Sequence, residues 1–267
     1  MKPSVNFTVL GGDQRMRACA EGLKALNFPT CDLQKPTVEE LTLRLQNTDV
    51  LILPIPAFSG PLIARTEILT EQLLQSVPVN TQIFAGVVPE KLRERIIDYN
   101  LDEAFQLSGA VATAEGTIAI LVNELPIALE GASCLIIGYG RIGKALASRL
   151  CALGMVVTVS ARKQADFQAI EACSLRADQT GIYHHGLHYD CIINTVPAAV
   201  LSAEQLAAVP KNCLLVDLAS KPGGLDWEAC SELGLQAIHA LGLPGKVAPT
   251  TSGLAIRDTV LNHLNLL

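Results

Sequence analysis

The feature that most constrains this sequence is a glycine-rich turn between an apolar strand and a helix. Residues 134–137 are apolar and strand-like, and residues 142–153 carry alanines and leucines at helical spacing. Between them stands the motif Gly138-Tyr139-Gly140-Arg141-Ile142-Gly143. In a dinucleotide-binding unit the first glycine permits the tight turn, the second lets the backbone approach the pyrophosphate, and the third lets the helix pack on the strand. The helix N-terminus adds N–H donors and a positive dipole end for phosphates, so we predict that a nicotinamide dinucleotide binds at residues 138–143.

The end of the next strand indicates which dinucleotide is bound. An NAD-binding chain usually has an acid there to bind the ribose 2′-hydroxyl. Here the strand ends in Ser160, Ala161, Arg162 and Lys163, with no acid. Arg162 can pair with a 2′-phosphate through its planar fork, and Ser160 can donate to it. We therefore predict NADP(H) over NAD(H); the alternative is that Arg162 and Lys163 are solvated loop residues.

Two later strand ends also belong to the predicted cofactor site, because the carboxyl ends of strands in an open α/β sheet face the ligand crevice. The predicted contacts there are Asn194, Thr195, Val196, Pro197, Leu218, Ala219 and Ser220, joined by Leu243 and Pro244 after the last strand. No metal is expected, because none of the eight cysteines forms a CxxC pair and no histidine lies at ligand spacing from them. We expect these cysteines to be small core residues.

Strands alternate with helices along the whole chain, which predicts an α/β protein with parallel sheets and helices on both faces. We expect two domains, a flavodoxin-like doubly wound domain over 1–130 and a Rossmann domain over 131–252. A helix within 253–267 is expected to pack back on the first domain. In the first domain we expect strands at 5–10, 50–53 and 81–85 and helices at 15–26, 38–45, 63–74 and 114–129, the last kinked or stopped by Pro126.

Composition excludes several classes of function. Hydrophobic residues make up 49% of the chain and the net charge is -6, so there is material for a large core but no basic face for nucleic acid or anionic membrane. Apolar stretches such as residues 50–53 are far shorter than the ~20 residues of a membrane span. No secretory signal is visible at the start, and we expect a cytoplasmic protein.

Several segments, in order along nearly the whole chain, are typical of one family. They are Gly11-Gly12-Asp13-Gln14-Arg15, Leu53-Pro54 through Ser59-Gly60, Thr113-Ala114-Glu115-Gly116, the 138–143 motif, Asn194-Thr195-Val196-Pro197, Asp217-Leu218-Ala219-Ser220-Lys221-Pro222-Gly223-Gly224 and Gly242-Leu243-Pro244-Gly245-Lys246-Val247-Ala248-Pro249. On these segments the chain resembles the dipicolinate synthase A-subunit family, which acts in spore formation. Its fold also looks like that of D-2-hydroxyacid and alanine dehydrogenases, but those families lack the last two strings.

The resemblance implies a reaction and a partner. A dihydro- or hydroxytetrahydrodipicolinate is oxidised to pyridine-2,6-dicarboxylate, and NAD(P)+ takes the hydride. The partner is the flavoprotein-like B subunit of dipicolinate synthase, and the location is the cytoplasm of the mother cell in sporulation. We also expect a homo-oligomer.

The substrate then carries two carboxylates, which need cations or aligned N–H donors. Arg15, beyond the first strand, and Lys221 are the main candidates to bind them. Ser59 and Gly60 can offer N–H groups, and Thr113 and Lys246 complete the predicted substrate-binding set. Each cation has the alternative of being an ordinary surface charge.

The catalytic set is Asp13, Arg15, Glu115 and Lys221, with Asp13 or Glu115 as general base. Asp13 can equally hold Arg15 in place, and Glu115 can equally be a first-turn acid of a helix capped by Thr113.

Two other functions remain open. One is an NADP-dependent reductase or dehydrogenase of another small carboxylated imine or hydroxy acid. The other is a nucleotide-binding subunit that is inactive without its partner. The second half shows no Arg/Glu/His catalytic set, which counts against a hydroxyacid dehydrogenase and leaves the subunit alternative open.

Overall fold

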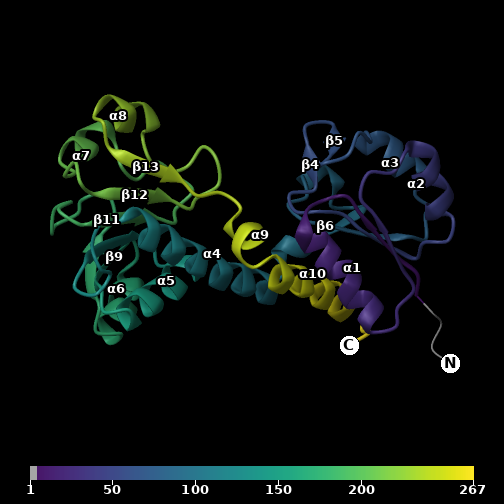
Figure 1. The fold of residues 1–267 in the computed structure, drawn as a ribbon, viewed down its shortest axis with the longest axis horizontal. Helices are drawn as coiled ribbons and strands as arrows, with labels where there is room; N and C mark the ends of the chain where they lie inside the picture. Colours follow the sequence, from purple (N-terminus) through teal and green to yellow (C-terminus); the bar gives the residue numbers. More distant parts are fainter. Residues whose placement is uncertain (1–4) are drawn as a thin grey trace. The chain divides into compact units, whose positions relative to one another are not determined.

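The structure is a computed structural model that describes residues 5–267, and it contains two compact units (Figure 1). The first unit comprises the chain up to residue 109 together with residues 248–267, and the second comprises residues 110–247. This division precedes the expected boundary near 130, because Ala114 and Leu121 lie in the core of the second unit. The domain limits at 130 and 252 stay predictions.

The first unit contains a five-stranded, fully parallel sheet in the order β2-β1-β3-β6-β7. Its strands are β1 (Phe7–Leu10), β2 (Thr30–Leu33), β3 (Val50–Ile52), β6 (Gln82–Ala85) and β7 (Ile96–Asp98). This is the doubly wound order of flavodoxin-like sheets, in which the chain reverses direction across the sheet between β1 and β3. The expected fold class is confirmed.

Helices cover the two faces of this sheet. They are α1 (Gln14–Ala25), α2 (Val38–Leu45) and α3 (Thr70–Ser76), with short 3-10 turns η1 (Glu90–Leu92) and η2 (Tyr99–Leu101). The helix expected over 63–74 is wrong in its first half. The small antiparallel hairpin of β4 (Phe58–Ser59) and β5 (Leu62–Ile63) reaches into that region, and a turn at 64–69 follows it.

The C-terminal helix α10 (Pro249–His263) packs against α1, as expected. Ile256, Val260 and Leu261 are fully buried in the same cluster as Phe7 and Phe84 of the sheet. Each such side chain contributes on the order of 1.5–3 kcal/mol of hydrophobic stabilisation. The chain end is therefore part of the first unit's core.

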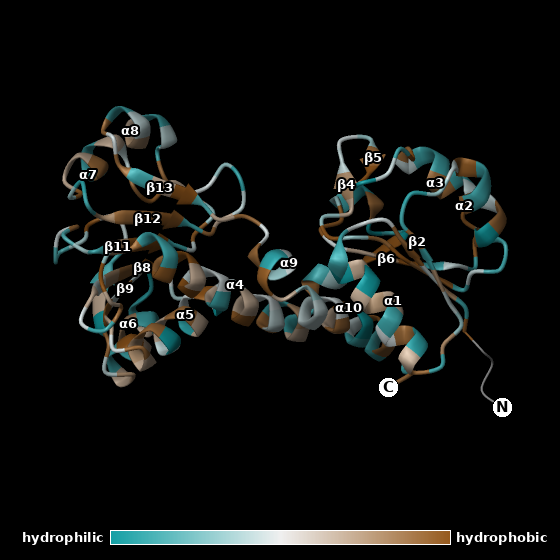
Figure 2. Ribbon diagram, viewed as in Figure 1, coloured by the Kyte–Doolittle hydropathy of each residue, from teal (hydrophilic) through white to brown (hydrophobic). Residues whose placement is uncertain are grey.

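The second unit contains a six-stranded parallel sheet in the order β10-β9-β8-β11-β12-β13, the Rossmann order. The strands are β8 (Ser133–Ile137), β9 (Val156–Ala161), β10 (Arg176–Gln179), β11 (Cys191–Asn194), β12 (Leu214–Asp217) and β13 (Gln236–His239). The helices are α5 (Arg141–Ala152), α6 (Gln164–Ala172), α7 (Ala203–Ala207), α8 (Trp227–Glu232) and α9 (Leu243–Val247). The central strands are hydrophobic (Figure 2), and two apolar clusters cover the two faces of the sheet.

Helix α4 (Glu103–Glu124) differs from the expected helix over 114–129. It begins eleven residues earlier (103 against 114) and ends before Pro126, which cannot continue a helix. Its 22 residues are long and apolar enough to cross a membrane by length and composition alone, contrary to the expectation that no such segment exists. Phe105 packs in the core of the first unit and Leu121 in that of the second, which is the pattern of a core helix.

The cysteines are free, and five of them are buried, as expected of small core residues. These are Cys19, Cys134, Cys191, Cys213 and Cys230. Burial raises the pKa of the Cys19 thiol to about 12, so this group stays protonated at neutral pH. Cys151 and Cys173 depart from the expectation, because both are exposed.

Candidate functional site

The glycine turn between β8 and α5 has a different physical requirement at each glycine. Gly138 has φ +101°, and a Cβ there would lie 2.5 Å from Oγ1 of Thr195. A Cβ on Gly143 would lie 2.1 Å from the carbonyl oxygen of Gly138, so only glycine lets α5 pack this closely on the turn. At Gly140 an added Cβ would meet nothing within 4 Å. The chain itself therefore requires glycine at 138 and 143, whereas at 140 the protein leaves open space.

A bound dinucleotide needs this open space, because its pyrophosphate approaches the backbone closely at the second glycine of the motif. Gly140 is the residue before the first turn of α5, and its peptide is extended, with φ -80° and ψ -165°. The first N–H groups of a helix lack intrahelical acceptors and carry a partial positive charge. No Asp or Glu stands in the first turn of α5 to neutralise it. The residues present fit the pyrophosphate of a nicotinamide dinucleotide.

The end of β9 corrects one predicted contact. Ser160 is completely buried, and its hydroxyl accepts a hydrogen bond from Thr180 at 3.0 Å, so it does not face outward to a 2′-phosphate. Its carbonyl accepts the Gly138 N–H at 2.9 Å and thereby positions the glycine turn. Arg162 and Lys163 are exposed, and within residues 5–267 neither pairs with an acid. The prediction of a 2′-phosphate contact therefore rests on Arg162 and Lys163.

The ends of β11 and β12 are joined by a buried carboxylate that the sequence did not single out. Asp217 has no exposed surface. Its Oδ1 accepts from Asn194 Nδ2 at 2.8 Å and from the Ala219 N–H at 3.0 Å, and its Oδ2 accepts from the Gly224 N–H at 2.7 Å. Asn194 also exchanges two hydrogen bonds with the backbone of Val196. One carboxylate thus fixes both loops of the predicted nicotinamide side.

This network explains the Pro-Gly-Gly string. A Cβ on Gly223 would lie 2.4 Å from Oδ2 of Asp217, and a Cβ on Gly224 would lie 2.3 Å from Nδ2 of Asn194. Both glycines are therefore required by close packing on the Asp217 network. His239, at the end of β13, contacts the carbonyl of Ala219 through Nε2 at 2.9 Å.

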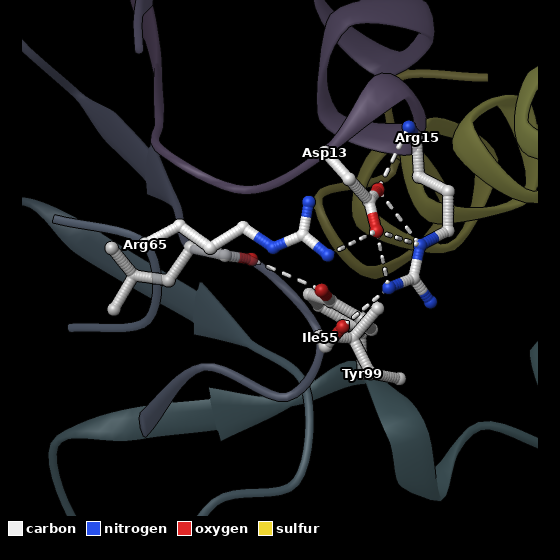
Figure 3. A network of polar contacts seen from close by, with 6 residues as sticks. Asp13, Arg15, Ile55, Arg65 and Tyr99 are labelled. Atoms are coloured by element: carbon white, nitrogen blue, oxygen red, sulfur yellow. Dashed lines mark hydrogen bonds and ion pairs between the residues drawn. The ribbon is translucent and has the colours of Figure 1, made fainter. Parts of the chain in front are cut away.

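In the first unit, Asp13 and Arg15 form a tight pair at the carboxyl end of β1 (Figure 3). Nε of Arg15 donates to Oδ1 of Asp13 at 2.9 Å, and Nη2 donates to Oδ2 at 2.8 Å. The same Nη2 donates to the carbonyl of Ile55, beyond β3, at 2.6 Å. Arg15 therefore bridges the β1 and β3 loops at the topological switch point, where ligands bind in open α/β sheets.

The environment of Asp13 argues against its predicted role as general base. Burial on its own raises the pKa of this carboxyl, but the hydrogen bonds and charge of Arg15, with the charge of Arg65, outweigh burial and leave the pKa below its ordinary value. A carboxylate with a lowered pKa is a weak proton acceptor. Its geometry matches the other expectation, that Asp13 holds Arg15 in place.

Arg65 is a residue of this site that the sequence did not reveal. Its Nη2 lies 3.6 Å from Oδ2 of Asp13, and its side chain is 62% exposed against 14% for Arg15. It follows β5 in the turn that was expected to be helical. No spacing rule links it to Asp13, because the contact depends on tertiary packing.

The remaining predicted substrate residues do not join this pair within the first unit. Ser59 and Gly60 lie exposed at the tip of the β4–β5 hairpin, not at the end of a sheet strand. Thr113 and Glu115 lie in the middle of α4, so the idea of Thr113 as an N-cap is wrong. Thr113 is buried, whereas Glu115, Lys221 and Lys246 are exposed.

The predicted cofactor contacts on the later loops are of two kinds. Leu218, Ala219 and Leu243 are buried, and Leu218 and Leu243 belong to the core of the second unit. Ser220 and Pro197 are exposed. Leu243 packs close to Gly116, where an added Cβ would lie 3.1 Å from its Cβ. The buried members shape the loops, and only their backbone groups remain available to a ligand.

Comparison with known proteins agrees with this geometry. Residues 115–221 match the sequence family described as D-isomer specific 2-hydroxyacid dehydrogenase, NAD binding domain. The A subunit of dipicolinate synthase from Bacillus subtilis (strain 168) is 28% identical over 286 residues, covering 97% of this chain and 96% of that protein. The crystal structure of the same subunit from Bacillus halodurans superposes with a TM-score of 0.88 at 25% identity, covering 99% of both chains.

The resemblance to the dipicolinate synthase A-subunit family is confirmed. The crystal structure of the Bacillus subtilis protein also superposes, with a TM-score of 0.87 at 26% identity, covering 99% of this chain and 97% of that one. A transhydrogenase from Sinorhizobium meliloti shares the fold alone, at 14% identity and a TM-score of 0.68. The second unit is a nicotinamide-dinucleotide-binding domain of the dehydrogenase type, which supports an oxidoreductase.

Proposed function

We propose that this chain oxidises a dihydrodipicolinate, or its hydroxytetrahydro precursor after loss of water, to pyridine-2,6-dicarboxylate. The observation that carries this proposal is similarity to the A subunit of dipicolinate synthase over 97% of the chain. The dehydrogenase-type domain supplies the matching redox chemistry.

The balance of the step defines what the protein must do. The dihydro ring loses a hydride from carbon and a proton, and the product ring is aromatic, which favours the reaction. A nicotinamide, when bound at the glycine turn, would supply the hydride acceptor. The chain has to hold the ring in one orientation, keep both carboxylates paired and accept the proton. Orientation alone can lower a barrier by several kcal/mol.

Arg15 is the residue that we propose for one substrate carboxylate. Asp13 and the Ile55 carbonyl occupy its Nε and Nη2, which fixes the guanidinium in place. Nη1 has no hydrogen-bond partner among the described residues and remains for a ligand (Figure 3). A charge-assisted hydrogen bond from an oriented guanidinium is about twice as strong as a neutral one. Lys221 and Lys246, both exposed in the second unit, are alternative proposals for the second carboxylate.

Glu115 remains our proposed proton acceptor. Its carboxylate is exposed on α4, whereas the pKa of Asp13 is lowered by its arginines. Ser59, Gly60 and Thr113 complete the proposed substrate-binding set; Ser59 and Gly60 lie at a hairpin tip, and Thr113 is buried.

We propose NADP+ as the preferred oxidant. Arg162 and Lys163 follow β9 where an NAD-binding chain carries an acid, and both are exposed and without an ion-pair partner within residues 5–267. A carboxylate in that place would repel a 2′-phosphate, whereas an arginine fork pairs with it.

A partner and a location also belong to the proposal. The Bacillus subtilis relative is one lettered subunit of a synthase, which supports a partner subunit, and we propose that this partner is the flavoprotein-like B subunit. We further propose a homo-oligomer in the cytoplasm of the sporulating mother cell.

The test is product formation by the purified chain. The chain, with and without the flavoprotein-like partner, is given the cyclised precursor and NADP+, and pyridine-2,6-dicarboxylate is followed by its absorbance. Product in either condition supports the enzyme, and product only with the partner defines an obligate complex. Binding of NADPH without product in any condition would refute the proposed reaction and favour a nucleotide-binding subunit or a reductase of another small carboxylated compound.

A further inference from the structure

A pocket of about 510 Å³ opens at the carboxyl end of the first unit's sheet. Residues 35–38, which follow β2, line one side, and residues 65–68, which follow β5, line the other. Its volume lies within the range of small-molecule sites. All of its lining residues belong to the first unit, whereas the glycine turn at 138–143 belongs to the second.

Two cations line this pocket. Lys35 and Arg65 are both exposed, and Glu67 is the single acid among the lining residues, so the pocket has an excess of one positive charge. Thr37 and Thr66 add hydroxyl groups, which already bind backbone atoms. Such a lining suits a small anion better than an apolar ligand.

Packing fixes the turn that carries Arg65. Gly11, at the end of β1, has φ +64°, and a Cβ there would lie 2.9 Å from Cγ2 of Thr66 and 3.3 Å from the carbonyl oxygen of Ala64. Arg65 itself has φ +62°, a conformation that non-glycine residues rarely adopt. Strain of this kind persists only where the surroundings impose it, and it is concentrated at functional sites. The β1 end and the 64–66 turn therefore hold Arg65 between the pocket and Asp13.

The charge of Arg65 is available for a ligand. Both oxygens of Asp13 already accept from Arg15 at 2.8 and 2.9 Å, whereas Nη2 of Arg65 is 3.6 Å away. An exposed ion pair at that separation contributes little to stability. Turning Arg65 from Asp13 to an incoming anion thus leaves Asp13 paired and loses almost nothing.

We propose that the pocket lined by residues 35–38 and 65–68 binds one carboxylate of a small dicarboxylate, with Lys35 and Arg65 as its charged contacts. This proposal rests on the proposed function for the identity of the ligand. Asp13 lies beside both Arg15 and Arg65, but of the two arginines only Arg65 is among the residues that line the pocket. With Glu67 counted, the lining residues carry one net positive charge, which matches a single carboxylate.

Calorimetric titration with pyridine-2,6-dicarboxylate tests the proposal directly. The wild-type chain, Arg65→Gln, Lys35→Gln and the matched control Arg17→Gln are titrated, with NADPH binding measured on each as a check of folding. Arg17 is an exposed arginine of α1 outside the pocket lining, so its substitution removes the same charge. We expect Arg65→Gln to raise the Kd about 10- to 100-fold, as loss of a charge-assisted contact does. Lys35→Gln raises it less, and Arg17→Gln leaves it within about twofold.

Inorganic phosphate is titrated as a second probe, and it should bind more weakly than the dicarboxylate. Wild-type binding that Arg65→Gln and Lys35→Gln leave unchanged would overturn the pocket. The pocket would also be overturned if the wild-type chain bound NADPH but no dicarboxylate. Phosphate binding as tight as dicarboxylate binding would overturn it as well. Arg65-dependent binding without turnover would refute the proposed reaction but leave the pocket standing. Turnover by the wild-type chain, with dicarboxylate binding that does not depend on Arg65, would support the proposed reaction and overturn the pocket.

Discussion

Alanine at Gly140 and at Gly143 should separate cofactor binding from folding. The two residues lie in one turn and the substitution is the same, but their surroundings differ. A Cβ at 140 meets no protein atom within 4 Å, whereas a Cβ at 143 would lie 2.1 Å from the Gly138 carbonyl oxygen and 3.0 Å from its carbon. The first substitution fills space that we expect the pyrophosphate to need, and the second forces α5 away from the turn.

The magnitudes follow from these distances. Gly143→Ala meets backbone, which cannot turn aside like a flexible side chain, so it should lower the free energy of unfolding by about 1–3 kcal/mol, the range for overpacking. For a chain of this size that is on the order of 2–4 °C in Tm per kcal/mol. Gly140→Ala keeps an allowed φ of -80° and should change stability by less than about 1 kcal/mol. Loss of a charge-assisted phosphate contact should nevertheless weaken NADPH binding about 10- to 100-fold.

Urea unfolding and fluorescence titration with NADPH measure the two quantities on the same samples. Gly140→Ala should match the wild-type unfolding midpoint and lose NADPH affinity, while Gly143→Ala should lose both. Wild-type NADPH affinity in Gly140→Ala would refute the placement of the pyrophosphate at this turn. Wild-type stability in Gly143→Ala would refute the packing argument.

Four further substitutions test the 2′-phosphate contact, the substrate contact, the buried Asp217 network and the Asp13–Arg15 ion pair. Arg162→Ala should raise the Kd of NADPH about 10-fold or more and barely change that of NADH, and equal losses would refute the 2′-phosphate contact. Arg15→Ala should spare NADPH affinity but abolish turnover, whereas retained turnover removes Arg15 from the site. Asp217→Ala leaves three buried donors without their acceptor and should lower the free energy of unfolding, measured in urea, by several kcal/mol. A loss under about 1 kcal/mol would contradict this role of Asp217. Because the folded-state pKa of Asp13 is lowered, its contribution to stability is complete above about pH 4 and is lost as the pH falls through the folded-state pKa. Asp13→Asn should therefore reduce the loss of stability at acid pH, measured by urea unfolding. An unchanged pH dependence would contradict the Asp13–Arg15 ion pair.

The parts of the fold that follow from local patterns were predictable from the sequence. The strand–turn–helix at 134–153 needs only an apolar run, three glycines and helical spacing, and the regular alternation of elements predicts both parallel sheets. The edge strand β10 does not follow from hydrophobic periodicity, because its sequence Arg176–Gln179 is polar and has one buried residue. The early turns of α4 were missed because Gly109 and small residues interrupt the apolar period.

Some residues of the candidate site were likewise predictable from local patterns, and others were not. The roles of Gly138 and Gly143 follow from the local strand–turn–helix motif. The structure has the expected tight turn at Gly138 and the expected close helix packing at Gly143. Arg65 and Asp217 depend on contacts between loops distant in the sequence, which no spacing rule gives. Ser160 was misjudged because the end of a strand can point either outward or into the sheet, and only the register decides. Its complete burial places its hydroxyl against Thr180.

The stoichiometry of turnover tests whether this chain oxidises its substrate with a nicotinamide bound at the glycine turn. With the cyclised precursor, NADP+ and the partner subunit where it is needed, reduced nicotinamide and pyridine-2,6-dicarboxylate are quantified in the same reaction. We expect one NADPH for each product molecule, and loss of both in Gly140→Ala. Product formed without NADPH, or formed equally well by Gly140→Ala, would contradict it.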